Sequence, residues 1–423
     1  GGSGADSFTL SGSGNISGVI SGGGGNDTLI GNNLTNTWAI SGSNSGTLTD
    51  SHGGNNFTGI SNLTGGSSTD SFTLSGTGHI SGVISGGGGN DTLIGNNLAT
   101  TWAISGSNSG TLTDSNGTNN FTGISNLTGG SGDDDFVFSD GQGVSGTVDG
   151  GAGGINILDF SAYSTAVGIT LTGSNPFGYS GTTAGSPNPT GGFAQITQID
   201  EPASLSNILT LQNGIASTVT INSSTPIDLF NLTVNVSGAP NLVFTNIGTV
   251  NGGAGASNTL ISGEATNNTW TLTSANGGSY NDGQNLIFSN FGTLIGGSGN
   301  DNFVLAGGSI TSINGGAGSN TLSGDNSGDS FNISAANSGT VTGLVTGFSN
   351  IQNLSGGAGN DTFTLSGTGH ISGLINGGGG VDTLTGNNLT NVWAISGANA
   401  GTLTDANGSN SFVGITNLTG GSG

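Results

Sequence analysis

A twelve-residue stretch, GGGGNDTLIGNN, occurs at residues 22–33 and again, letter for letter, at residues 86–97. A near copy, GGGGVDTLTGNN, stands at residues 377–388. The flanking residues repeat as well, so that Phe8, Phe72 and Phe136 follow one another at equal intervals. A fixed period of this kind indicates a repeat architecture in which each unit stacks on its neighbours. It overrides the two or three globular domains that a length of 423 residues would otherwise suggest.

Within one repeat, short apolar doublets such as SFTL and TWAI alternate with Gly- and Asn-rich turns, a pattern typical of short strands. The first repeat divides into three rungs, at residues 1–21, 22–41 and 42–64. We therefore predict an all-β fold, a parallel β-solenoid (β-helix) with about 20 rungs of about 21 residues. The abundance of Gly, Ser, Thr and Asn would also fit disorder, but the apolar residues keep a fixed phase, which disfavours it.

The positions at which the repeat begins again divide the chain into six predicted sections. They are repeats at 1–64 and 65–128, an irregular section at 129–250, a partial repeat at 251–295, a shortened repeat at 296–355, and a repeat with the start of the next at 356–423.

All six prolines lie in the irregular section, and residues 173–192 read as a Pro-containing loop. Long loops are often functional, so Phe177 and Tyr179 are candidates for contact with a neighbour, the alternative being a tolerated excursion.

Four tryptophans occupy the same position in their repeats, which predicts that they stack in a packed ladder or fill a corner of the solenoid. They are Trp38, Trp102, Trp270 and Trp393.

The composition excludes several classes of function. The chain has no Lys, Arg, Cys or Met and a formal charge of −23, so cohesion must come from backbone pairing and apolar ladders. Nucleic-acid binding and docking on anionic lipid need basic residues and are not expected. Thiol chemistry is excluded, which suits an oxidising location, and no long apolar run predicts a transmembrane helix. The sequence lacks a starting Met and a signal peptide, and we expect a mature product or a window of something longer.

The turn GGxGxDxUx, in which U is a large apolar residue, is the motif that can carry chemistry. Its aspartates are Asp6, Asp27, Asp70, Asp91, Asp134, Asp301, Asp361 and Asp382. The motif resembles the haemolysin-type calcium-binding nonapeptide of RTX proteins. The resemblance implies that Gly carbonyls and Asp carboxylates of successive turns would enclose Ca²⁺. A divalent cation would also relieve the repulsion between carboxylates stacked one rung apart.

Two departures keep a second interpretation open. RTX motifs run in tandem every nine residues, whereas these aspartates alternate between a shorter and a much longer spacing, as from Asp6 to Asp27 and from Asp27 to Asp70. Degraded copies have Ile155 and Asn320 in the Asp position. The alternative is that Asp or Asn hydrogen-bonds the backbone of a tight Gly turn.

The wider unit, NNLTNTWAISGSNSGTLTD…FTGISNLTGGSGDDDF, is similar to repeats of giant bacterial β-strand-repeat surface proteins, as is LDFSAYSTAVGITL at residues 158–171. The resemblance implies a secreted or surface-attached role in adhesion, matrix or filament formation. Because the first and last repeats are interchangeable, we expect a structural protein that forms a filament, sheath or adhesin stalk. Its partner would be itself, head to tail, or adjoining repeats of a longer chain. The alternative is a monomeric calcium-binding stalk segment.

Other activities are less well supported. A polysaccharide-cleaving β-helix enzyme could use the carboxylates of residues 133–135, but the turn motif explains them and no cation would hold an acidic glycan. His52, His79 and His370 place one imidazole per rung, which makes no metal set. Threonines such as those of TLTD are scattered rather than confined to one face, which disfavours ice binding. We therefore expect no enzyme.

Overall fold

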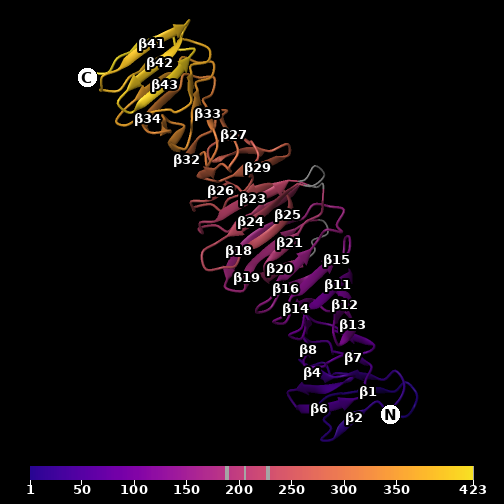
Figure 1. Ribbon diagram of the computed structural model, residues 1–423. Coiled ribbons are helices and arrows are strands. Elements are labelled where there is room, and N and C mark those ends of the chain that lie inside the picture. Colours follow the sequence, from indigo (N-terminus) through magenta and orange to yellow (C-terminus); the bar gives the residue numbers. More distant parts are fainter. Residues whose placement is uncertain (186–189, 204–205, 225–228, 423) are drawn as a thin grey trace. The chain divides into compact units, whose positions relative to one another are not determined.

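The computed structural model of the chain describes residues 1–185, 190–203, 206–224 and 229–422 (Figure 1). Those residues form 44 β-strands and no helix, and most strand pairings are parallel. The sheet is not closed into a barrel. The predicted all-β, parallel β-solenoid class is therefore confirmed.

The chain divides into two compact units. The first comprises Gly1–Leu209 and Ser237–Asn246, and the second comprises Thr210–Val236 and Ile247–Gly423.

The first two repeats lie in the first unit and have the same seven strands each. Those of the first repeat are β1 Ser7–Thr9, β2 Val19–Ser21, β3 Thr28–Ile30, β4 Thr37–Gly42, β5 Ser45–Asp50, β6 Gly53–Thr58 and β7 Asn62–Thr64. Those of the second are β8 Ser71–Leu74, β9 Val83–Ser85, β10 Thr92–Ile94, β11 Thr100–Gly106, β12 Ser109–Asp114, β13 Gly117–Thr122 and β14 Asn126–Thr128.

Stacking in the first unit follows two different steps. Leu29 pairs with Phe8 on one side and with Leu63 on the other, and Leu93 lies in the same way between Phe72 and Leu127. Hydrogen bonds between stacked layers span 21 residues at the shorter step. At the longer step they span 34 residues between Asn36 and Asp70 and 39 residues between Ile16 and Asn55. The prediction of equal rungs is therefore corrected, because only the shorter step has the predicted length.

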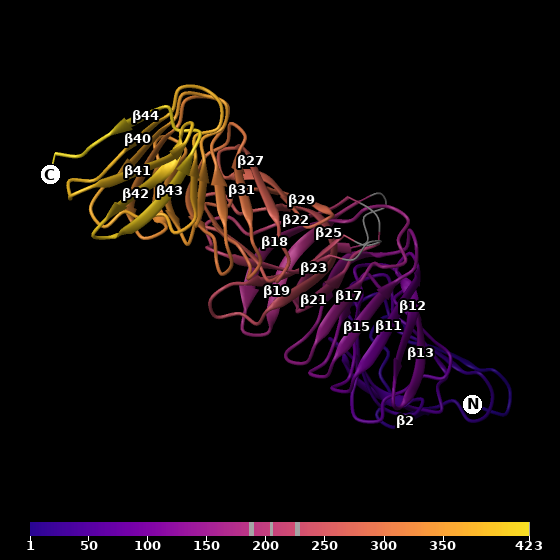
Figure 2. The same ribbon diagram turned by 45° about the horizontal axis from the view of Figure 1, so that its top comes forward.

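The longer step contains an antiparallel meander that the sequence analysis did not predict. β4 pairs with β5 and β5 with β6, both antiparallel, and β11, β12 and β13 repeat this arrangement (Figure 2). The turn between the first two strands holds Asn44 at φ 51° and Asn108 at φ 54°. Asparagine tolerates this left-handed conformation, which tight hairpins require.

The core is a set of apolar ladders between the stacked strands. Trp38 and Trp102 are fully buried, and their rings stack on Phe72 and Phe136 of the following strand at 5.4 Å between centroids. Trp38, Trp102 and Trp270 are packed, as predicted, but each stacks on a phenylalanine rather than on another tryptophan. Trp393 is half-buried and has only an edge contact with Phe412 among the described residues.

The irregular section continues the first unit with strands β15 Asp134–Phe138, β16 Val144–Asp149, β17 Asn156–Asp159, β18 Gly168–Asn175, β19 Gly178–Ala184, β20 Thr190–Ile196 and β21 Gln198–Asp200. The loop predicted at 173–192 is wrong for its described residues, because β18 and β19 form a hairpin and β20 pairs with β19. Tyr179, Thr183 and Thr190 supply buried positions within this stretch that the Pro and Gly signals concealed. Pro187 and Pro189 lie outside the described residues.

β22 Asn207–Thr210 and β25 Leu242–Asn251 contribute residues to both units. The other strands of the second unit up to residue 323 are β23 Thr218–Ser224, β24 Phe230–Asn235, β26 Thr259–Ser262, β27 Thr269–Ser274, β28 Gly277–Asn281, β29 Asn285–Ser289, β30 Thr293–Ile295, β31 Asn302–Leu305, β32 Ile310–Asn314 and β33 Thr321–Ser323. They are followed by β34 Ser330–Ala335, β35 Ser338–Val341, β36 Val345–Ser349, β37 Asn353–Ser355, β38 Thr362–Leu365, β39 Leu374–Asn376, β40 Thr383–Thr385, β41 Val392–Gly397, β42 Ala400–Asp405, β43 Gly408–Val413 and β44 Asn417–Thr419.

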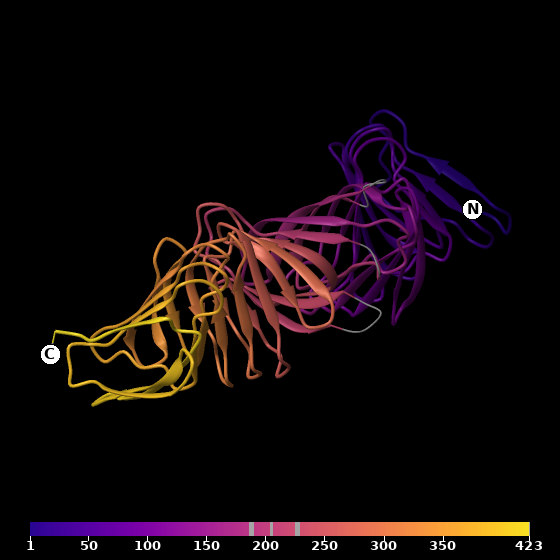
Figure 3. The same cartoon turned by 90° about the horizontal axis from the view of Figure 1, so that it is seen from above.

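The same stacking plan recurs in the second unit, where strands drawn in orange lie side by side (Figure 3). Leu322 pairs with Phe303 on one side and with Leu354 on the other. Both steps are shorter here, since the hydrogen bonds that join the layers through Asn320 span 19 residues and 32 residues. In the last repeat, from Phe363 to Leu384 and on to Leu418, the steps regain the lengths of the first repeats.

Candidate functional site: aspartate and asparagine corners

The eight motif aspartates lie at corners, where the chain enters a strand after a glycine turn. All except the half-buried Asp6 are at most 1% exposed. A buried carboxyl group needs hydrogen-bond partners, so their positions can be interpreted from the groups that they contact.

One oxygen of each buried motif carboxylate accepts a hydrogen bond from a neighbouring rung, from Trp102 Nε1 at Asp134 and from a backbone N–H at the others. The backbone N–H of Asp6 donates to Asp27 Oδ1 at 2.8 Å, and that of Asp70 donates to Asp91 Oδ1 at 2.7 Å. The backbone N–H of Asp361 donates to the Oδ1 atom of Asp382 at 2.8 Å. These aspartates therefore form short ladders in which the carboxylate of one rung satisfies the backbone N–H of the aspartate in the rung before it.

The second oxygen divides the corners into two groups. Asp70 Oδ2 accepts from Gly66 N at 2.6 Å, and Asp134 Oδ2 accepts from Gly130 N at 2.9 Å. In the other group, the buried Oδ2 atom makes no hydrogen bond within the described residues. Its members are Asp27, Asp91, Asp301, Asp361 and Asp382.

This corner explains the first glycine of the motif. A Cβ atom on Gly86 would lie within 3.0 Å of Asp91 Oδ2 and of the carbonyl oxygen of Gly123 in the next rung. Gly65 has the same two kinds of neighbour, namely Asp70 Oδ2 and the Gly86 carbonyl. The spacing from the first Gly to Asp is thus required by packing between two oxygens.

The sequence analysis missed one aspartate of the same kind. Asp329 is 5% exposed, accepts from Asp325 N at 2.8 Å through Oδ2, and donates its backbone N–H to Asp361 Oδ1 at 2.7 Å. Its stretch, GDNSGDSF, keeps a Gly five residues before the Asp, at Gly324, and that spacing alone could have found it.

Asparagines perform the corresponding role at other corners. Val83 N donates to Asn62 Oδ1 at 3.1 Å, and Ile16 N donates to Asn55 Oδ1 at 2.7 Å. Ser81 N donates to Asn44 Oδ1 at 2.9 Å. In every case the donor belongs to a different rung, so amide side chains hold the stack together where strand pairing stops.

Burial raises the pKa of several of these carboxyl groups, because the charged form loses hydration. The pKa is raised to about 6 at Asp91, Asp134, Asp301 and Asp329. The charge of Asp70 adds to the effect at Asp91. These groups gain a proton more readily in the folded chain than in water.

A separate acidic row crosses β15, β17 and β21. Burial and then the charges of Asp159 and Asp200 raise the pKa of Asp135 to about 6. Next to this row, Glu201 is fully buried, and neither of its oxygens has a hydrogen-bond partner among the described residues. Burial therefore raises its pKa well above the usual range.

The three consecutive acids considered for catalysis do not converge. Asp133 accepts from Ile155 N at 2.8 Å, whereas Asp134 is buried in its corner and Asp135 belongs to the acidic row.

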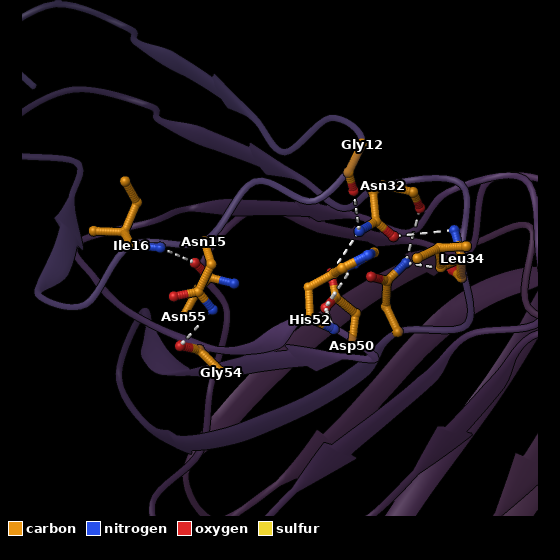
Figure 4. Close-up of polar contacts among 10 residues, drawn as sticks. Gly12, Asn15, Ile16, Asn32, Leu34, Asp50, His52, Gly54 and Asn55 are labelled. Atoms are coloured by element: carbon orange, nitrogen blue, oxygen red, sulfur yellow. Dashed lines mark hydrogen bonds and ion pairs between the residues drawn. The ribbon is translucent and has the colours of Figure 1, made fainter.

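The histidines lie apart from one another. Figure 4 shows His52 beside Asp50, with Nδ1 at 3.6 Å from Oδ1, while Asn32 donates to the other carboxylate oxygen. His79 and His370 each contact a backbone carbonyl at 3.3 Å.

Of the two residues suggested as contacts for a neighbour, Phe177 is 48% exposed at the β18–β19 turn, whereas Tyr179 is 1% exposed. Only Phe177 is therefore accessible in this structure.

Within the described ranges, no three His, Asp or Glu side chains are grouped so that they could hold a metal ion. The same residues contain no helix that could cross a membrane. A scan against protein-family models gives no match, and a search of curated proteins gives none either.

Proposed function

We propose that this chain is a structural β-solenoid of the bacterial cell surface or exterior, without enzyme activity. It builds a filament, sheath or adhesin stalk by stacking rungs head to tail, either with further copies or with adjoining repeats of a longer chain. The observation that carries the proposal is the exposure of apolar side chains at the two edges of the chain, since interior repeats bury the equivalent residues.

At the first edge, Ile16 is 48% exposed, whereas Ile80, its equivalent in the second repeat, is 0% exposed. At the last edge, Ile395 is 60% exposed, whereas Ile104 is 0% exposed. Contiguous exposed apolar residues and unpaired strand edges favour association with a further strand.

The cohesion of the stack also suits growth by addition of rungs. Without Lys or Arg, the contacts between rungs are backbone pairs, apolar ladders and the Asp and Asn corners. These contacts recur from repeat to repeat, so one more repeat gains the same kinds of contact as the one before it. The lack of Lys and Arg also removes trypsin sites, which supports an exterior location.

Calcium binding stays a second proposal, in which the chain is a monomeric stalk segment. The observation that favours it is the buried Oδ2 atom without a hydrogen bond at Asp27, Asp91, Asp301, Asp361 and Asp382. Hard cations prefer such oxygen ligands, although Ca²⁺ takes six or more of them.

Negative-stain electron microscopy of the purified chain, with millimolar calcium and again after chelation, tests both proposals. Fibres in both conditions support head-to-tail stacking with the aspartates as structural corners. Fibres only with calcium would make the aspartates a calcium-dependent switch. Single particles in both conditions would contradict self-assembly by the isolated chain.

A further inference from the structure

The N-terminal edge presents two strands with one free side. β1 pairs with β3 and β2 pairs with β6, whereas their equivalents β8 and β9 have a described partner on each side. A hollow of about 460 Å³ opens between them and is lined by Phe8, Leu10, Ile16, Val19 and Ile20, among others. In the second repeat, strands β4 and β7 of the preceding repeat pair with the equivalent strands β8 and β9.

The C-terminal edge presents the strands that would fill such a hollow. β41 pairs with β42, whereas its equivalent β11 pairs with both β12 and β15. β44 pairs with β40, whereas its equivalent β7 pairs with β3 and β9. Val392 is 61% exposed on β41, and Leu418 is 38% exposed on β44.

We infer, on the basis of the proposed function, that a second copy of this chain docks in one defined register, with its β1 beside β41 and its β2 beside β44. The register copies that of β4 on β8 and of β7 on β9. The paired residues, one from each copy, are Val392 with Ser7, Trp393 with Phe8, Ala394 with Thr9, Ile395 with Leu10, Leu418 with Ile20, and Thr419 with Ser21.

The aromatic rings support this register. Trp38, Trp102 and Trp270 each stack on a phenylalanine of the following rung, with angles of 13°, 18° and 9° between the ring planes. Trp393 has an edge contact with Phe412 and no stacked ring among the described residues. The inferred register places Phe8 of the second copy where that stacked ring belongs.

The corner hydrogen bonds support the same register. Asn36 N donates to Asp70 Oδ1 at 2.7 Å inside the chain, so Asn391 N would donate to Asp6 Oδ1 of the second copy. The bond from Val83 N to Asn62 Oδ1 similarly predicts one from Val19 N to Asn417 Oδ1.

The C-terminal segment, residues 420–422, must move when the second copy docks. Residues 420–422 occupy the place that residues 1–3 of the second copy would take, because Gly421 lies against Asn387 O as Gly66 lies against Asn32 O. Ser422 N also donates to Asn388 Oδ1 at 2.8 Å. A variant that lacks residues 420–423 should therefore associate more strongly than the full chain.

Disulfide trapping tests the register, and the absence of cysteine from the chain removes any background. Paired residues of neighbouring strands lie about 4.8 Å apart, within the range that a disulfide bridges, whereas a two-residue offset places them about 8 Å apart. The T9C/A394C variant should therefore form cross-linked oligomers on mild oxidation. The S7C/A394C variant, offset by two residues, should stay largely monomeric on a non-reducing gel. The A39C/T73C variant is the matched control, because its sites pair inside one chain.

Sedimentation of the oxidised and reduced samples separates the possible outcomes. Cross-linking of S7C/A394C instead of T9C/A394C would overturn the register and leave head-to-tail stacking intact. Association without either cross-link, while A39C/T73C forms its internal disulfide, would show that copies meet through other surfaces and overturn the inference. An absence of association would overturn the inference together with self-stacking of this chain.

Discussion

The second repeat and the last repeat have nearly the same sequence, yet their outer strands differ in burial. β11 of the second repeat buries Trp102 and Ile104 completely, whereas Ile395 on β41 is 60% exposed. The two strands differ in their neighbours: β11 has β15 on its far side, whereas no strand of the described residues lies on that side of β41. Burial on this strand is therefore supplied by the next rung rather than by the repeat itself.

The other half of the last repeat does not show this difference. Leu403 and Phe412 stay at 0% and 3% exposed, like Leu112 and Phe121 in the second repeat. Their contacts come from the meander β41–β42–β43, which the repeat forms on its own (Figure 1). Each repeat thus combines a part that buries itself with a part that depends on its neighbour.

The largest expected effect is the contrast between two tryptophan substitutions. W102A should lower the free energy of unfolding by about 3–5 kcal/mol, because it removes a fully buried ring from the core. W393A should cost the isolated chain less than half of this, since Trp393 lacks a stacked neighbour among the described residues. Urea unfolding at concentrations below association measures both, and equal losses would contradict the comparison.

The second expected effect concerns the corner carboxylates. D91A removes the acceptor of the Asp70 N–H and should cost about 1–3 kcal/mol, because that buried donor is left without a partner. D91N keeps an oxygen in the same place and should cost less. D6A, at the edge, should cost least in the isolated chain. A larger loss for D6A than for D91A, in the same unfolding measurement, would contradict the ladder.

The third expected effect is the dependence of stability on pH without calcium. The folded chain holds protons at Asp91, Asp134, Asp301 and Asp329 up to a pKa of about 6, whereas an unfolded Asp releases them near its ordinary pKa of 3.8. The stabilisation is therefore fully present below about pH 4 and is lost as pH rises through 6. Thermal unfolding between pH 4 and 8 should show a falling midpoint, with a shallower fall for D91N. A midpoint that rises over this range would contradict burial of these carboxyl groups.

The smallest expected effect is that of salt on association. Two copies with a formal charge of −23 each repel one another, and salt screens this repulsion. Added sodium chloride should therefore strengthen association modestly in sedimentation experiments while changing the stability of the isolated chain less. Dissociation by salt would indicate that ionic contacts hold the copies together, and in a chain without Lys or Arg only the three histidines could supply cationic side chains for them.

Much of this architecture was predictable because every repeat makes the same contacts. The glycine and aspartate spacing, as at Gly86 and Asp91, reports a corner with a fixed steric requirement, and the period reports stacking. The meander was missed because its turn depends on a single left-handed residue, Asn44, within a stretch of small residues that also suits a loop. Asp329 was missed because Asp325 replaces the second glycine of its motif.

Exposure at the edges was not predictable from the sequence, since Trp102 and Trp393 stand in nearly identical stretches. Burial of Glu201 was also hidden, because it depends on the packing of rungs whose register the irregular section obscures.

Cryo-electron microscopy of the assembled chain is the most direct test of rung stacking between copies. The account predicts fibres in which strands follow one another at about 4.8 Å without a break at the junction, with β1 of one copy beside β41 of the next. Fibres joined through the outer faces of the strands, with both edges still exposed, would contradict it.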